Sequence, residues 1–130
     1  MTTRTTSELY LVDSSGWLEY ITEDSKAGSF AHYLENEAAV IVPSLVIYEV
    51  YRQLARHRGK PLADRFLSQA LHCRVVPLDE MTALAAADAS LNHRLAMTDA
   101  LLYATARAHH AQFVTANTKL RGLPAVIIPG

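Results

Sequence analysis

Short apolar runs alternate with amphipathic segments along this chain. Continuous apolar runs of the kind found in buried parallel strands occur at residues 9–12, 39–42, 73–76, 112–114 and 125–128. Apolar residues at helical spacing predict helices at residues 17–21, 29–37, 45–57, 61–72, 80–94 and 99–110. Strands that alternate with helices favour a parallel sheet covered on both faces. The predicted fold class is therefore α/β: a three-layer α/β/α sandwich with a central, mainly parallel sheet.

Local signals suggest where several of these helices begin and which way they face. Ser44 and Thr98 are candidate N-caps for the third and the last helix. Gly59 is placed to end the helix at residues 45–57. Asp88 falls on the helical stripe of Leu84, Leu91 and Leu95, so we expect it to face inward.

Composition is that of a single globular domain spanning residues 1–130. Half of the residues are hydrophobic, 19% are charged, and the only cysteine is Cys73. One cysteine excludes a disulfide scaffold and a thiolate-clustered zinc site. The apolar runs are too short to cross a membrane, and residues 1–6 lack the apolar core of a secretory signal. We therefore expect a cytoplasmic protein without a membrane segment.

The charges are unevenly distributed although the net charge is only −1. Residues 1–50 carry two basic and eight acidic groups, whereas residues 51–80 carry six basic and three acidic groups. The overall balance predicts no general affinity for nucleic acid. The basic stretch is most simply a solvated helix face.

Polar residues follow the first and fourth predicted strands. Asp13 comes directly after residues 9–12, and Thr115 and Asn117 follow residues 112–114. Ligands of open parallel sheets bind beyond the carboxyl ends of the strands, which makes these residues candidates for a site. Each also has a simpler explanation: Asp13 could cap the next helix, and Thr115 and Asn117 could form a turn.

Two further carboxylates lie near predicted helix starts or on a helix. Glu49 stands among apolar neighbours and could pair with Arg52, whereas Asp99 suits the positive end of a helix dipole. If Asp13, Glu49 and Asp99 converge, their mutual repulsion calls for a cation. Oxygen ligands select a hard ion, Mg²⁺ or Mn²⁺, which can activate water against a phosphodiester.

Four ordered segments carry a family resemblance: LVDSS at residues 11–15, IYEV at 47–50, TDALLYATA at 98–106 and VTAN at 114–117. Through them the chain resembles the PIN-domain ribonucleases and, among these, the VapC-like toxins of bacterial toxin–antitoxin pairs. The third segment is the most specific match. Because the segments extend from residue 11 to residue 117, the resemblance covers almost the whole chain.

The resemblance implies a metal-dependent endoribonuclease. Asp13, Glu49 and Asp99 would hold Mg²⁺ or Mn²⁺, with Asn117 and Thr115 assisting in catalysis. Many relatives have Asp where this chain has Asn117, and the amide removes one negative charge, which favours one tightly held ion over two. The implied partners are an RNA substrate, a small antitoxin whose tail blocks the active groove, and a second copy of the chain.

Four basic residues are candidates for holding RNA phosphates. Arg52 and Arg56 follow Glu49 on one helix face, and Lys119 and Arg121 follow the fourth segment. The alternative for each is an ordinary surface charge.

Competing functions differ in the residues they need. A phosphotransfer receiver needs an aspartate after the third strand, where Pro77 precedes Asp79 and interrupts the strand edge. A haloacid-dehalogenase-like phosphatase needs a second aspartate at the position of Ser15. A catalytically degenerate PIN-like module that binds RNA or a protein without cleavage stays open because of Asn117.

Overall fold

The computed structural model describes residues 8–130, so the polar stretch at residues 1–6 lies outside the described residues. Its strands are β1 (Leu9–Val12), β2 (Ile41–Pro43), β3 (Arg74–Val76), β4 (Ala111–Val114) and β5 (Val126–Ile127). Its α-helices are α1 (Ser14–Ile21), α2 (Ala27–Leu34), α3 (Ser44–His57), α4 (Lys60–Ala70), α5 (Glu80–His93) and α6 (Met97–Ala108). Two 3₁₀ turns, η1 (Glu37–Ala39) and η2 (Thr118–Leu120), complete the elements.

All strand pairings among the described residues are parallel. Strand β4 pairs with β1 and β5, and β2 pairs with β3. A bridge between Tyr10 and Val40 joins the two groups, which gives the spatial order β3-β2-β1-β4-β5. Val12 is the register partner of Val114, so β1 and β4 end level and the residues that follow them lie side by side.

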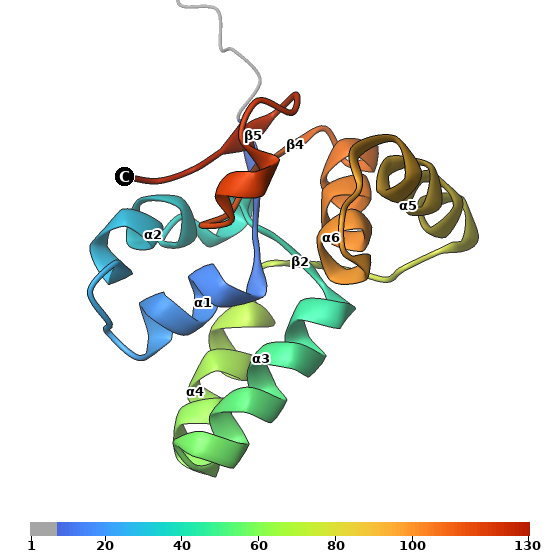
Figure 1. The fold of residues 1–130 in the computed structure, drawn as a ribbon. Coiled ribbons are helices and arrows are strands. Elements are labelled where there is room, and N and C mark those ends of the chain that lie inside the picture. The colour runs from blue at the N-terminus through green and yellow to red at the C-terminus, as the bar shows by residue number, and fades with distance from the viewer. Residues whose placement is uncertain (1–7) are drawn as a thin grey trace, which may run out of the picture.

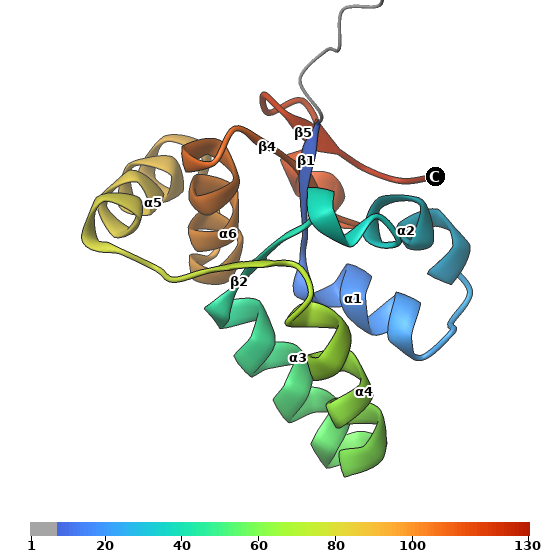
Figure 2. The same ribbon diagram turned by 180° about the vertical axis from the view of Figure 1, so that it is seen from behind.

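The helices cover both faces of this sheet (Figures 1 and 2). Helices α1 and α2 lie on one side, α5 and α6 lie on the other, and α3 and α4 form a hairpin that projects away from the strand ends. The α/β/α sandwich predicted from the sequence is confirmed. None of the helices in residues 8–130 is long and apolar enough to span a bilayer.

The core lies where α1 crosses the sheet. Trp17 is fully buried and meets Phe66 of α4 edge to face, with ring centroids 5.2 Å apart. Gly16 lets α1 lie close to β1 and α2, since a Cβ built there would lie 2.5 Å from a Val12 methyl and 2.7 Å from the Phe30 ring. Any side chain at position 16 would therefore push α1 away from β1.

Two expected N-caps are wrong. Helix α3 already includes Ser44 and is preceded by Pro43, and α6 begins at Met97 after Ala96. Ser44 and Thr98 therefore lie within the first turns of these helices, where their backbone is helical and their side chains do not cap. Asp99 stays in the first turn of α6, as the sequence indicated.

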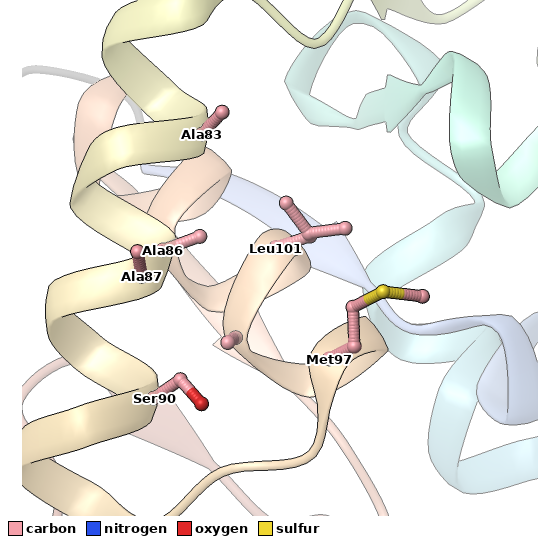
Figure 3. Close-up of a pocket in the computed structure, with 7 residues that line it drawn as sticks. Ala83, Ala86, Ala87, Ser90, Met97 and Leu101 are labelled. Carbon is pink, nitrogen blue, oxygen red and sulfur yellow. The ribbon is translucent and has the colours of Figure 1, made fainter.

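The expected inward stripe is wrong for its residues on α5, although Leu95, just beyond the helix, is buried. Leu84 and Leu91 are 65% and 81% exposed, and Asp88 is exposed as well. Small residues of α5 instead face α6 (Figure 3): Ala83, Ala86, Ala87 and Ser90 line a hollow of about 280 Å³ with Met97, Ala100 and Leu101. Because alanines occur on every face of this segment, the leucines did not mark the buried side.

Candidate metal and active site

Asp13 links the sheet to α1. One carboxylate oxygen, Oδ1, accepts hydrogen bonds from the Gly16 backbone N–H at 2.8 Å and from the Ser15 hydroxyl at 3.0 Å. The other, Oδ2, accepts from the Thr115 hydroxyl of the neighbouring strand end at 2.6 Å. Asp13 is thus the N-cap of α1, which confirms the simpler of the two explanations, and it also lines a cleft, which keeps it a candidate site residue.

The electrostatic surroundings of Asp13 oppose its charge. Only 7% of its surface is exposed, and this burial raises the pKa of Asp13 above its ordinary value. The hydrogen bonds from Thr115, Gly16 and Ser15 lower that pKa, and the charge of Asp99 raises it again. The net direction is upward, and the contribution from Asp99 shows that the two carboxylates interact.

Glu49 is held by Ser14, a residue that was not among the sequence-predicted site residues. The Ser14 hydroxyl donates to Glu49 Oε1 at 2.6 Å. Among residues 8–130, Glu49 forms no ion pair with Arg52, the alternative suggested by their spacing. Ser14 directly follows Asp13 in the chain, and this position next to a candidate site residue is the sequence feature that could have identified it.

Asp99 and Asn117 contact each other directly. Asn117 donates its side-chain amide to Asp99 Oδ2 at 2.9 Å, and its carbonyl oxygen accepts from the Lys119 backbone N–H at 3.0 Å. The Asn117 backbone N–H donates to the Thr115 hydroxyl oxygen at 3.0 Å. Thr115 therefore connects Asn117 to Asp13 in one hydrogen-bonded chain.

These side chains line one cleft of about 250 Å³ at the carboxyl ends of β1 and β4. Its lining residues are Asp13, Ser14, Ser15, Glu49, Thr98, Asp99, Leu102 and Asn117. No lysine or arginine within residues 8–130 forms an ion pair with any of the three carboxylates. The carboxylates share the cleft without closing a cage: no three His, Cys, Asp or Glu side chains in the described part of the chain meet at metal-binding distances.

The four basic candidates lie in different places. Lys119 lines a neighbouring hollow that shares Asp99 and Asn117 with the cleft. Arg52, Arg56 and Arg121 are exposed and line neither hollow.

Arg94 lines the neighbouring hollow and was missed from the sequence. The sequence feature that could have identified Arg94 is its position in the short connection that leads into the TDALLYATA segment. By contrast, the hollow between α5 and α6 is lined by alanines, Ser90, Met97 and Leu101 and holds no titratable side chain (Figure 3).

Comparisons with known proteins agree with this architecture. The family model for the PIN domain matches residues 10–125. No curated protein matches the chain. Solved structures do: a chain of a toxin–antitoxin complex from Klebsiella pneumoniae has a TM-score of 0.81 at 18% identity and covers 93% of this chain and 98% of its own.

Two further solved structures share the fold. VapC20 from Mycobacterium tuberculosis, described as a toxin that cleaves the sarcin–ricin loop, has a TM-score of 0.74 at 18% identity, with 93% of this chain and 99% of that chain covered. A chain of FitAcB from Neisseria gonorrhoeae has a TM-score of 0.72 at 18% identity, with 93% and 98% covered. The class that fold and cleft define is that of the PIN domains, and because the family model spans most of its length, this chain belongs to the PIN domain family. Its structural neighbours include a toxin–antitoxin complex and the toxin VapC20.

Proposed function

We propose that the protein is a metal-dependent endoribonuclease, the toxin of a toxin–antitoxin pair, and that it hydrolyses RNA phosphodiester bonds. One observation carries the proposal: Asp13, Glu49 and Asp99, brought from three elements, line one cleft with Asn117 and have no basic ion-pair partner within residues 8–130. Membership of the PIN domain family supports the same chemistry.

The donor set of the cleft suits a hard divalent ion such as Mg²⁺ or Mn²⁺. All its polar side chains offer oxygen atoms, apart from the Asn117 amide nitrogen, which already donates to Asp99. Asp13 Oδ2 accepts one hydrogen bond and keeps a lone pair, while Asp99 Oδ1 and Glu49 Oε2 receive no hydrogen bond from residues 8–130. We assign the ion to Asp13, Asp99 and Glu49, which must draw together to hold it.

In this proposal the carboxylates bind the ion, and neighbouring residues hold the carboxylates in position. A bound ion supplies Lewis-acid stabilisation of the phosphate and a water of lowered pKa. Thr115 and Gly16 fix the Asp13 carboxylate, Ser14 fixes Glu49, and Asn117 fixes Asp99. Glu49 and Asp99 are each anchored through one oxygen, which leaves the other for the ion. Asp13 is anchored through both oxygens and would offer the remaining lone pair of Oδ2.

The proposed partners follow from the family and its neighbours. One neighbouring structure is a toxin–antitoxin complex, and we propose a small antitoxin that covers the cleft, as well as a cytoplasmic location. We also propose a homodimer. Met81, Leu84, Leu91 and Met97 are 65–81% exposed on α5 and at the start of α6, an apolar surface that a second copy could bury. A double change, Leu84→Glu with Leu91→Glu, should then yield monomers in analytical ultracentrifugation.

The decisive experiment is an RNA digest with purified protein. Wild type should cleave RNA with Mg²⁺ or Mn²⁺ and stop when the ion is chelated. Asp99→Asn, which removes a charge at constant shape, should lower the rate about 10²-fold or more. Asp88→Asn is the matched control, because Asp88 is exposed on α5 and does not line the cleft.

The second candidate is a degenerate PIN module that binds RNA or a protein without cleaving. Asn117 favours it, because its amide uses both of its polar ends inside the protein, on Asp99 and on Lys119. RNA that binds wild type but stays intact at every Mg²⁺ and Mn²⁺ concentration would select this candidate.

A further inference from the structure

A second hollow, of about 350 Å³, adjoins the acidic cleft. Asp99 and Asn117 line both hollows, so the two adjoin at this hydrogen-bonded pair, and we refer to the two adjoining hollows together as the groove. On the far side of Asp99 the lining changes in charge, to His93, Arg94 and Lys119. The groove therefore passes from carboxylates at one end to basic side chains at the other.

The charges of Arg94 and Lys119 are available to an outside ligand. Both residues are exposed, and neither forms an ion pair with any carboxylate in the described part of the chain. This holds although both share the hollow with Asp99. A cationic wall without internal partners next to an acidic cleft is suited to a ligand that carries several negative charges.

The backbone conformation of Arg94 makes glycine a well-matched replacement for a test. Arg94 is the C-cap of α5 and has φ 55° and ψ 44°, in the left-handed region. Glycine or asparagine is the usual residue there, because a Cβ is unfavourable in this conformation. Glu23, His110 and Ala125 have a similar positive φ, so the conformation assigns no use to the side chain, but it means that glycine can replace Arg94 without backbone strain.

We propose that Arg94 and Lys119 bind the phosphate that neighbours the cleaved one in the RNA strand. This inference rests on the proposed nuclease function. When one phosphate lies in the acidic cleft, the adjacent phosphate must lie along the groove or leave it. Beyond Asp99 the groove offers a guanidinium, whose paired donors match phosphate oxygens, and an ammonium. The contact sets the position of the strand, so Arg94 is a positioning residue.

The test is a double-mutant cycle: the charge of Arg94 is removed in the protein, and the charge of the neighbouring phosphate is removed in the RNA. Arg94→Gly suits the backbone and removes the charge, so its melting temperature should equal or exceed that of wild type. On ordinary RNA it should lower kcat/KM about 10-fold or more, mainly through KM. On RNA with a neutral methylphosphonate at the contacted neighbouring position, wild type and Arg94→Gly should cleave equally. Methylphosphonates are placed on each side of the cleaved bond in turn.

Controls and outcomes separate this inference from the proposed function. Arg107→Ala removes an exposed charge of α6 that lies outside the groove, and should leave kcat/KM unchanged. Equal losses for Arg94→Gly on the ordinary and both methylphosphonate RNAs, or no loss on any of them, would overturn the phosphate contact. A loss of affinity only for a protein partner, with RNA cleavage intact, would overturn it in favour of a peptide ligand.

Failure of the nuclease proposal has a different signature, because wild type then cleaves no RNA. The binding of a fluorescent single-stranded RNA still tests the contact in that case. Arg94→Gly should reduce the slope of log K against log salt by about 0.7, the value for one phosphate contact. An unchanged slope would overturn the contact whether or not the protein cleaves RNA.

Discussion

Asp13 has a structural role and a chemical role, and two substitutions separate them. Its carboxylate accepts hydrogen bonds from Gly16, Ser15 and Thr115. Asn keeps an acceptor for the cap, and its amide can donate to Thr115 once that hydroxyl turns. Ala keeps neither contact. Loss of the cap and an unsatisfied buried hydroxyl together make Asp13→Ala less stable than Asp13→Asn by about 2–4 kcal/mol, a melting difference on the order of 10 °C.

The difference in unfolding free energy between Asp13→Asn and wild type should depend on pH, and the sign of this dependence follows from the pKa of Asp13. Because the pKa of Asp13 is raised in the folded protein, chiefly by burial, the folded state binds the proton more tightly than the unfolded chain. The ionised carboxylate therefore costs stability at neutral pH, and this cost disappears as the pH falls through the folded pKa. Without metal, Asp13→Asn should be the more stable protein at neutral pH, and the difference should shrink in acid.

Thermal melts across pH, with and without Mg²⁺, measure both effects. Mg²⁺ at 100 times its Kd should stabilise wild type by about 2.7 kcal/mol and should not stabilise Asp13→Asn. Both substitutions should abolish RNA cleavage. An Asp13→Asn protein that melts below wild type at neutral pH without metal, or keeps a constant difference across pH, would refute the reasoning about buried charge.

Three other substitutions test how the fold holds the cleft. Thr115→Val removes the largest hydrogen-bond contribution that lowers the pKa of Asp13, so the acid limb of the rate–pH profile should move to higher pH, while Thr115→Ser should restore it. Ser14→Ala should keep the melting temperature within about 2 °C of wild type yet slow cleavage about 10-fold, because Glu49 loses its anchor; an unchanged rate would remove Ser14 from the site. Gly16→Ala should destabilise by about 1–3 kcal/mol or more, because its Cβ would meet Val12 and Phe30 at 2.5 and 2.7 Å; a wild-type denaturation midpoint would contradict this.

Sequence patterns predicted the sheet well because parallel strands are buried on both faces and appear as apolar runs. The level ends of β1 and β4 then placed Asp13 and Thr115 together, as expected from topology alone. Glu49 and Asp99 were selected by the family resemblance, and the structure brings both to the same cleft.

Other features depended on packing that the sequence does not encode locally. Ser44 and Thr98 look like caps, but the helices begin earlier, and cap preferences are too weak to override tertiary packing. The buried residues of α5 are Thr82 and Ala86, so the exposed Leu84 and Leu91 gave a misleading periodicity. Arg94 lies at the groove because its backbone is in the left-handed region. Such a turn is usually predicted from a glycine, and the sequence has none at this position.

The pairing of β1 with β4 has a consequence for how the protein is made. The Thr115 hydroxyl reaches Asp13 across 102 positions of the chain, and β4 supplies the neighbour of β1 on that side. During synthesis β1 leaves the ribosome early. The edge of β1 that pairs with β4 stays unpaired until residues 111–117 have also left the exit tunnel. The cleft between the ends of β1 and β4 therefore cannot form on a nascent chain before these residues have left the ribosome.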